Sequence, residues 1–184
     1  MALMKFKSLL VILIIARAVS VYATETPSGI PNPLIDYRAH RADVEKVEGI
    51  RETRRLSEEA FLRAAREPDT ILLDARSGPM FERLHIEGAL NLSFPDFTED
   101  ELAKIIPSKN TRVLIYCNNN FLGSPKAMPT KRAEISLNIS TFVALYAYGY
   151  TNVYELGPLL RVQSTRLPMV GSEITAAKNL KGLQ

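Results

Sequence analysis

The chain is poor in the residues that build cross-links, metal centres and nucleotide sites. Its 184 residues include one cysteine, two histidines and no tryptophan. A single cysteine cannot form an internal disulfide, so the fold must rest on its own core. No cysteines and histidines cluster with metal-ligand spacing, and no glycine-rich stretch resembles a phosphate loop. We therefore expect neither a metal nor a cofactor.

The amino terminus has the pattern of a secretory signal peptide, which we assign to residues 1–23. Lys5 and Lys7 precede a short apolar run at residues 9–16. Residues 21–23, Val-Tyr-Ala, then offer the small side chains of a cleavage site. This order of charge, apolar run and small residues predicts an exported protein.

An uncleaved membrane anchor is the alternative interpretation of this segment. Arg17 ends the apolar run well short of the ~20 residues that a membrane span needs. Attachment through a lipid-modified cysteine at the cleavage site is excluded, because no cysteine directly follows the run. We expect the protein in a bacterial periplasm, with no membrane span after cleavage.

Charge argues against a nucleic-acid partner. The full chain has 23 basic and 20 acidic residues, a formal net charge of +3 at pH 7. Three of the basic residues and none of the acidic ones lie in the predicted signal peptide, so 20 of each remain after cleavage. A balanced chain of this kind lacks the basic surface that nucleic acids need.

Composition divides the mature chain into three parts. Residues 24–54 form an N-terminal extension, which opens with a proline-rich tether. Its charged second half, residues 36–55, is compatible with a short helix packed on the domain or with a solvated arm. Regular patterning covers residues 55–160, and residues 161–184 form a C-terminal tail without a strong pattern.

Strand and helix patterns alternate through the middle part. Continuous apolar runs at 70–74, 112–116 and 152–156 predict buried strands. Helical spacing follows Ser57 and Thr98, which are suitable N-terminal caps, and helical spacing recurs over residues 135–149. Such alternation predicts an α/β fold with a parallel sheet covered on both faces by helices.

The only cysteine, Cys117, directly follows the apolar run at 112–116. Ligands of open α/β sheets gather beyond the carboxyl ends of the strands, near the start of the next helix. Backbone N–H groups and the positive end of a helix favour a thiolate there. On position alone, a reactive thiol and an inert buried side chain both remain open.

Four segments of the chain resemble a rhodanese domain. Residues 71–76 resemble its strand ending in Asp-x-Arg, and Phe81 with residues 85–91 resembles its "F…HIxGAxN" segment. Residues 113–117 resemble the strand that delivers the catalytic cysteine, and residues 148–157 the closing "GxxNVxxLxGG". Their order and separations agree over about residues 55–160.

The resemblance implies a fold and a chemistry. The fold is a sheet of about five parallel strands between helices. The chemistry is sulfur transfer, in which the Cys117 thiolate takes a sulfane sulfur from a donor and passes it to a thiol or another nucleophile. Asp74, Arg76 and His85 are expected to brace the reactive loop. The partners would be a small sulfur-containing donor and a thiol acceptor.

One feature departs from the family pattern, because the loop after Cys117 is enlarged and lacks an early basic residue. Leu122 and Gly123 stand where the family has a cation, which disfavours the phosphatase activity known for relatives of this fold. The asparagines after Cys117 could donate amide hydrogens to an anion or simply form turns. Our candidate substrate-binding residues are Asn118, Asn119, Asn120, Phe121, Lys131 and Arg132.

The enlarged loop also suggests a second function class. A non-catalytic rhodanese-fold module would bind an exported partner protein or a small anion through residues 118–135. The cysteine at the motif position favours catalysis, whereas the missing cation and the long insertion favour binding.

Overall fold

Short parallel strands form the centre of the fold. The structure is a computed structural model that describes residues 32–174, so the predicted signal peptide at 1–23 lies outside the described residues. The α-helices are α1 (Tyr37–Glu52), α2 (Glu58–Ala64), α3 (Gly78–Arg83), α4 (Glu99–Ile105) and α5 (Leu137–Ala147). Single 3₁₀ turns are η1 (Phe94–Asp96), η2 (Asn118–Asn120) and η3 (Ala133–Ile135). The strands are β1 (Arg55–Leu56), β2 (Thr70–Asp74), β3 (His85–Ile86), β4 (Leu90–Asn91), β5 (Arg112–Tyr116), β6 (Phe121–Leu122), β7 (Val153–Leu156), β8 (Leu160–Arg161) and β9 (Met169–Val170).

The main sheet has five parallel strands in the order β1-β7-β5-β2-β4. This arrangement confirms the predicted α/β fold with a parallel sheet and helices on both faces. Ile115 of β5 lies opposite Glu155 of β7, which in turn lies opposite Arg55 of the edge strand β1. Because the strands are parallel, their carboxyl ends meet at one edge, and Cys117 begins the loop there.

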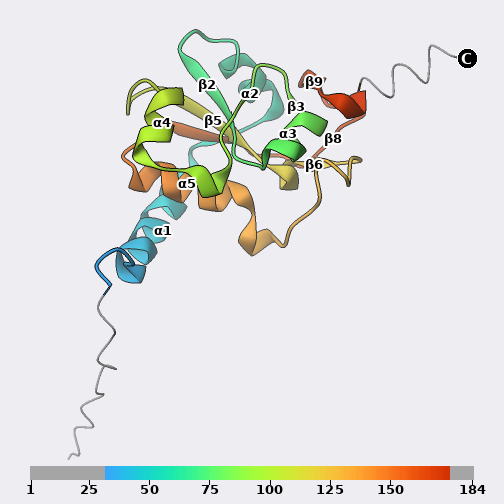
Figure 1. The fold of residues 1–184 in the computed structure, drawn as a ribbon. Helices are drawn as coiled ribbons and strands as arrows, with labels where there is room; N and C mark the ends of the chain where they lie inside the picture. Colours follow the sequence, from blue (N-terminus) through green and yellow to red (C-terminus); the bar gives the residue numbers. More distant parts are fainter. Residues whose placement is uncertain (1–31, 175–184) are drawn as a thin grey trace, which may run out of the picture. The chain divides into compact units, whose positions relative to one another are not determined.

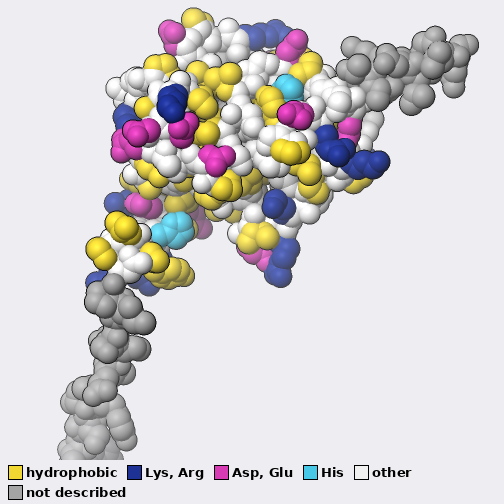
Figure 2. All heavy atoms as spheres, in the orientation of Figure 1, with side chains coloured by type: hydrophobic (Ala, Val, Ile, Leu, Met, Phe, Trp, Pro, Cys, Tyr) yellow, Lys and Arg dark blue, Asp and Glu magenta, His cyan; other side chains and the backbone are white. Residues whose placement is uncertain are grey.

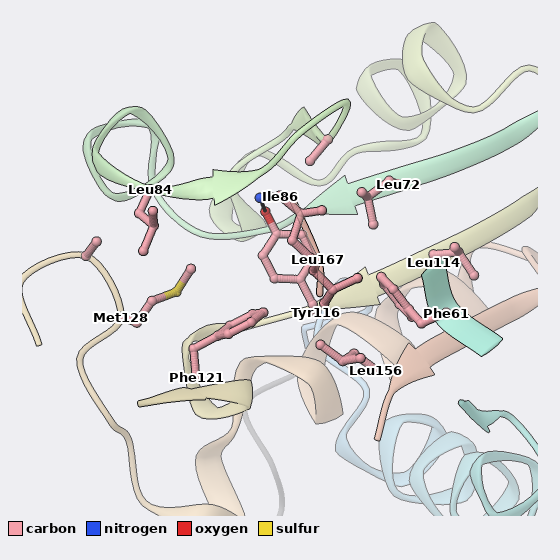
Figure 3. Packing of buried hydrophobic residues seen from close by; sticks show 12 residues of the cluster. Phe61, Leu72, Leu84, Ile86, Leu114, Tyr116, Phe121, Met128, Leu156 and Leu167 are labelled. Carbon is pink, nitrogen blue, oxygen red and sulfur yellow. Dashed lines mark hydrogen bonds between the residues drawn. The ribbon is translucent and has the colours of Figure 1, made fainter. Parts of the chain in front are cut away.

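Alternate residues of the central strands face opposite layers, as the pleat requires. Leu72, Leu114 and Tyr116 pack with Phe61 of α2 in one cluster (Figure 3). Leu73, Val113 and Ile115 belong to the second cluster, to which α1, α4 and α5 contribute. Figure 1 shows α1 and α5 together on one side of the sheet, with α2 on the other. Both faces are therefore covered, which explains the nearly continuous apolar sequence of these strands.

Local signals begin and end the helices as the sequence indicates. The Ser57 hydroxyl accepts a hydrogen bond from the Ala60 amide at 3.2 Å, and Thr98 does the same for Glu101 at 3.2 Å. Gly149 follows α5 with φ at +85°, a left-handed conformation that favours glycine at a helix end. These caps fix where α2, α4 and α5 can contact the sheet.

The charged segment after the tether forms α1, the first of the two alternatives that its sequence allowed. Asp36 caps the helix by accepting from the Ala39 amide at 2.9 Å. Val47 is its buried anchor and joins the cluster beneath the sheet, where α1 packs along α5. None of the helices in the described part of the chain has the length and apolar character needed to cross a membrane.

Residues beyond the expected domain end at 160 also pack on the fold. β8 pairs with β6, and β9 pairs antiparallel with β3. Leu167 is buried in the same cluster as Phe61. These strands have only two residues each, so they carry no periodicity that a sequence could reveal.

We expect Val47→Ala to lower the free energy of unfolding by about 2 kcal/mol, because buried methyl groups are lost and a cavity remains. Val44 lies in the same helix but is 36% exposed, so Val44→Ala serves as the control. Its effect should stay below about 0.5 kcal/mol. Equal effects of the two substitutions in urea unfolding would contradict the packing of α1 on the domain.

Candidate active site

Cys117 lies where its sequence position indicates, at the end of β5 and beside the start of α5. Its Sγ atom is 3.5 Å from the Oγ atom of Ser136, the N-terminal cap residue of α5. The Ser136 hydroxyl makes no capping hydrogen bond to the helix. The unpaired amides of a helix N-terminus carry partial positive charge. The sulfur therefore lies beside the N-terminal end of α5.

The thiol lines a cavity of about 260 Å³, although only 1% of the Cys117 surface is exposed. Residues from α1, β1, β7 and α5 form the walls of this cavity together with the start of the loop. The lining residues besides Cys117 are Arg51, Arg55, Asn119, Asn120, Ala133, Ser136, Asn138, Ile139, Glu155, Leu156 and Gly157.

A buried carboxylate and two guanidinium groups share one wall of this cavity. The Oε1 atom of Glu155 is 2.6 Å from Nη2 of Arg51 and 3.3 Å from Nε of Arg55. Arg55 also donates to the carbonyl of Gly157 at 3.2 Å. Glu155 is fully buried, so the two guanidinium groups, rather than water, compensate its negative charge.

Neither arginine was among the predicted site residues. Both precede the motifs that identify the domain, and the pairing of β1 with β7 brings Arg55 opposite Glu155. The only sequence signal is the charge of Glu155 within an otherwise apolar strand, because a buried acid requires a partner.

Asn120 holds the loop at the carboxyl edge of the sheet. Its Oδ1 atom accepts from the Cys117 amide at 2.9 Å and from Nδ2 of Asn138 at 3.1 Å. Its Nδ2 group donates to the carbonyls of Leu156 at 2.8 Å and Pro158 at 3.3 Å. The hydrogen-bonding groups of this side chain are thus engaged in bracing the residue that follows β5.

The other two asparagines tie the beginning of the loop to its middle. Asn118 donates to the carbonyl of Pro129. Asn119 makes two hydrogen bonds with the backbone of Lys131, donating at 3.0 Å and accepting at 2.8 Å. Of the two roles considered for these side chains, the observed hydrogen bonds are those of turn formation.

Four predicted substrate-binding residues are not among the described residues that line the Cys117 cavity. The Phe121 ring is buried in the core, edge-on to Tyr116 with centroids 6.1 Å apart (Figure 3). Arg132 is exposed and forms an ion pair with Glu134. Lys131 lines a separate, largely apolar cavity of about 420 Å³, together with Asn118. The loop thus separates residues that are close in sequence.

Asp74 and Arg76 brace the loop from within the protein. Nη2 of Arg76 is 2.5 Å from Oδ2 of Asp74, and both side chains are buried. The guanidinium also donates to the carbonyls of Ala127 in the loop at 2.9 Å and Leu84 at 2.7 Å. The Tyr116 hydroxyl donates to Asp74 at 2.6 Å. This network connects β2 and β5 to the loop.

The network sets the protonation of its members. Burial disfavours the charged guanidinium, but the hydrogen bonds and charge of Asp74 outweigh it and raise the pKa of Arg76 above its ordinary value. Burial, reinforced by the Asp74 charge, raises the pKa of Tyr116 well above its ordinary value. Arg76 thus stays charged and Tyr116 neutral near pH 7, as their hydrogen bonds require.

His85, the third residue predicted to brace the loop, contacts α3. Its Nδ1 atom is 2.7 Å from the carbonyl oxygen of Phe81, and its ring stacks on the Phe81 ring at a centroid distance of 3.7 Å. These contacts tie the turn between α3 and β3. Within residues 32–174, no three His, Cys, Asp or Glu side chains group as metal ligands.

Arg76→Leu should lower the free energy of unfolding by about 3–5 kcal/mol, since it leaves Asp74 buried without its charged partner. Arg63, which pairs with Glu59 on the surface of α2, offers a control. Arg63→Leu should cost no more than about 1 kcal/mol. Denaturant unfolding measures both, and similar losses would mean that the buried ion pair does not hold the loop.

Solved structures with similar folds share little sequence with this chain. A rhodanese from E. coli, solved with anions, is 23% identical over 56% of this chain and 99% of its own, with a TM-score of 0.38. The Alr3790 protein from Anabaena is 18% identical over 68% of this chain and 99% of its own, with a TM-score of 0.44. A thiosulfate sulfurtransferase from Pseudomonas aeruginosa is 23% identical over 65% of this chain but only 20% of its own, with a TM-score of 0.43.

No curated protein matches the chain significantly. The family model of the rhodanese-like domain matches residues 57–156, more than half of the chain. That segment runs from the cap of α2 to the end of β7 and includes Cys117. The chain therefore belongs to the rhodanese-like domain family.

Proposed function

We propose that the protein is a sulfurtransferase or persulfide carrier that holds sulfane sulfur on Cys117. One observation carries the proposal. The only cysteine of a rhodanese-like domain lines a cavity at the carboxyl edge of the sheet, with its Sγ atom 3.5 Å from the cap residue of α5. The N-terminal end of α5 would favour negative charge on the sulfur, and a small donor has room beside it.

The reaction consists of two displacements on sulfur. The Cys117 thiolate attacks the outer sulfur of a persulfide R–S–SH, and the donor's S–S bond breaks as R–S⁻ leaves. Cys117 then carries the persulfide. An acceptor thiolate attacks the outer sulfur, the second S–S bond breaks, and the Cys117 thiolate is restored. Each bond broken is replaced by one formed, so no external oxidant or reductant is needed.

The residues around the sulfur have distinct tasks in this scheme. The Cys117 amide is occupied by Asn120, so it does not face the substrate. Ser136 and the amides at the start of α5 would stabilise negative charge on the thiolate and on the persulfide. This differs from a compact loop, which would surround the sulfur with its own amides.

The sequence also predicts the compartment in which this activity would take place. The predicted signal peptide at residues 1–23 would export the protein to a bacterial periplasm, where it would meet a small sulfur donor and a thiol acceptor. In an oxidising compartment a single cysteine has no internal disulfide partner and remains available for exchange.

A second candidate function rests on the exposed tip of the enlarged loop. Ile135 is 59% exposed next to the charged pair of Arg132 and Glu134. This part of the chain projects ahead of α5, and apolar and charged side chains mix there on the surface (Figures 1 and 2). An exported partner protein could bind this tip, with or without sulfur transfer.

Incubation of the mature protein with an organic persulfide should add one sulfur atom to the intact mass, and cyanide or a thiol should remove it. Cys117→Ala should show no gain, because it lacks the accepting sulfur. A folded wild-type protein that gains no sulfur from persulfide or thiosulfate would contradict the enzyme proposal and favour the binding module.

Ser136→Ala should slow sulfur loading of Cys117 about three- to tenfold, because a hydrogen bond to an anion is lost. Stability should change little, since the hydroxyl does not cap α5. Ser77 is a matched control, because it is the cap residue of α3 and also lacks a capping hydrogen bond. Equal loading by Ser77→Ala, Ser136→Ala and wild type would remove Ser136 from the scheme.

A further inference from the structure

Two arginines that precede the matched family segment place positive charge beside Cys117. Arg51 lies in the last turn of α1 and Arg55 begins β1, and both line the cavity of Cys117. Both lie outside the segment 57–156 that defines the family. The loop's own cations, by contrast, lie elsewhere: Lys131 lines the other cavity and Arg132 pairs with Glu134.

The charges in this wall suit a ligand with one negative charge. Two guanidinium groups face the single carboxylate of Glu155, which leaves one positive charge in excess. Arg55 is 56% exposed, so its guanidinium is accessible to a ligand, whereas Arg51 is 25% exposed and holds Glu155 more closely. A dianion such as thiosulfate, beside an anionic sulfur, would exceed the available positive charge.

A polar group in the same wall also points to a polar ligand. The Nε–H group of Arg51 is buried and has no hydrogen-bond partner among the described residues. Arg51 lines the Cys117 cavity, and a buried donor without a partner is costly unless a ligand accepts from it. At about 260 Å³ the cavity is smaller than the usual sites of drug-sized ligands, which begin near ~300 Å³. The ligand is therefore small as well as polar.

We infer that Arg51 and Arg55 bind the carboxylate of a small organic persulfide, and that such persulfides, which carry one negative charge in the R–S–SH form that reacts, are the sulfur donors of Cys117 rather than thiosulfate. Arginine pairs well with a carboxylate, because its planar donors match the two oxygens. The inference rests on the proposed sulfur transfer at Cys117 and names the substrate class of that site.

Two matched donors test the inference: the persulfide of 3-mercaptopropanoate, which carries a carboxylate, and that of 3-mercaptopropanol, which carries a hydroxyl instead. Wild-type Cys117 should gain sulfur about tenfold faster from the carboxylate donor. Arg55→Gln should lose most of this preference, because it slows loading from the carboxylate donor more than loading from the hydroxyl donor. Arg55→Lys, which keeps the charge, should retain part of it.

Further variants separate binding from folding. Arg51→Gln should also lower the preference, but it removes a partner of buried Glu155, so thermal unfolding is measured beside it. Arg41→Gln is the control, because Arg41 lies in the same helix and its ion pair among the described residues is with exposed Glu45 at 3.8 Å. Its donor preference should equal that of the wild type.

Alkylation gives a second readout that needs no sulfur transfer. Iodoacetate and iodoacetamide differ by one charge, and each reaction forms an S–C bond on Cys117 as iodide leaves. The ratio of the iodoacetate rate to the iodoacetamide rate should be higher for wild-type Cys117 than for free 2-mercaptoethanol. In Arg55→Gln this ratio should fall to that of 2-mercaptoethanol.

The outcomes distinguish this inference from the function on which it rests. Equal loading from both persulfides, or a preference that survives Arg55→Gln, overturns the inference and leaves sulfur transfer standing. Faster loading from thiosulfate than from the carboxylate persulfide also overturns it. No loading from any donor overturns the proposed function and this inference with it.

Discussion

The buried ion pair of Asp74 and Arg76 is the interaction on which the site depends. Charges removed from water are tolerated only when every donor and acceptor finds a partner. Arg76 meets this requirement by reaching both the Leu84 carbonyl and the Ala127 carbonyl in the loop. The loop cannot leave the sheet without exposing that guanidinium to an apolar interior. The buried ion pair thereby fixes the long loop to the core of the domain.

Holding the insertion in this way changes how the reactive edge is built. A short loop would wrap its amides and a cation around the sulfur. Here the asparagine side chains of the loop hold its conformation, because Asn118, Asn119 and Asn120 all form hydrogen bonds with backbone groups. Positive charge instead reaches the cavity from α1 and β1. The proposed sulfur chemistry at Cys117 would thus take place beside positive charge from outside the segment 57–156.

The fold was largely predictable because its information is local and periodic. Apolar runs, caps and Gly149 define the strands and helices, and the motifs identify the position of Cys117. The site was less predictable because it depends on strand register. Nothing near Arg55 in sequence indicates that it faces Glu155. The burial of the Phe121 ring was unpredictable for a similar reason, since a two-residue strand such as β6 does not show which way its side chains point.

The two-residue edge strand β1 has a further consequence for dynamics. Edge elements with few contacts open more readily than the sheet centre, in cooperative units of their own. Opening of β1 together with α1 would withdraw both guanidiniums at once, while Cys117 stayed on the central strand. Reactivity toward anions would then follow the local stability of this edge rather than that of the whole domain.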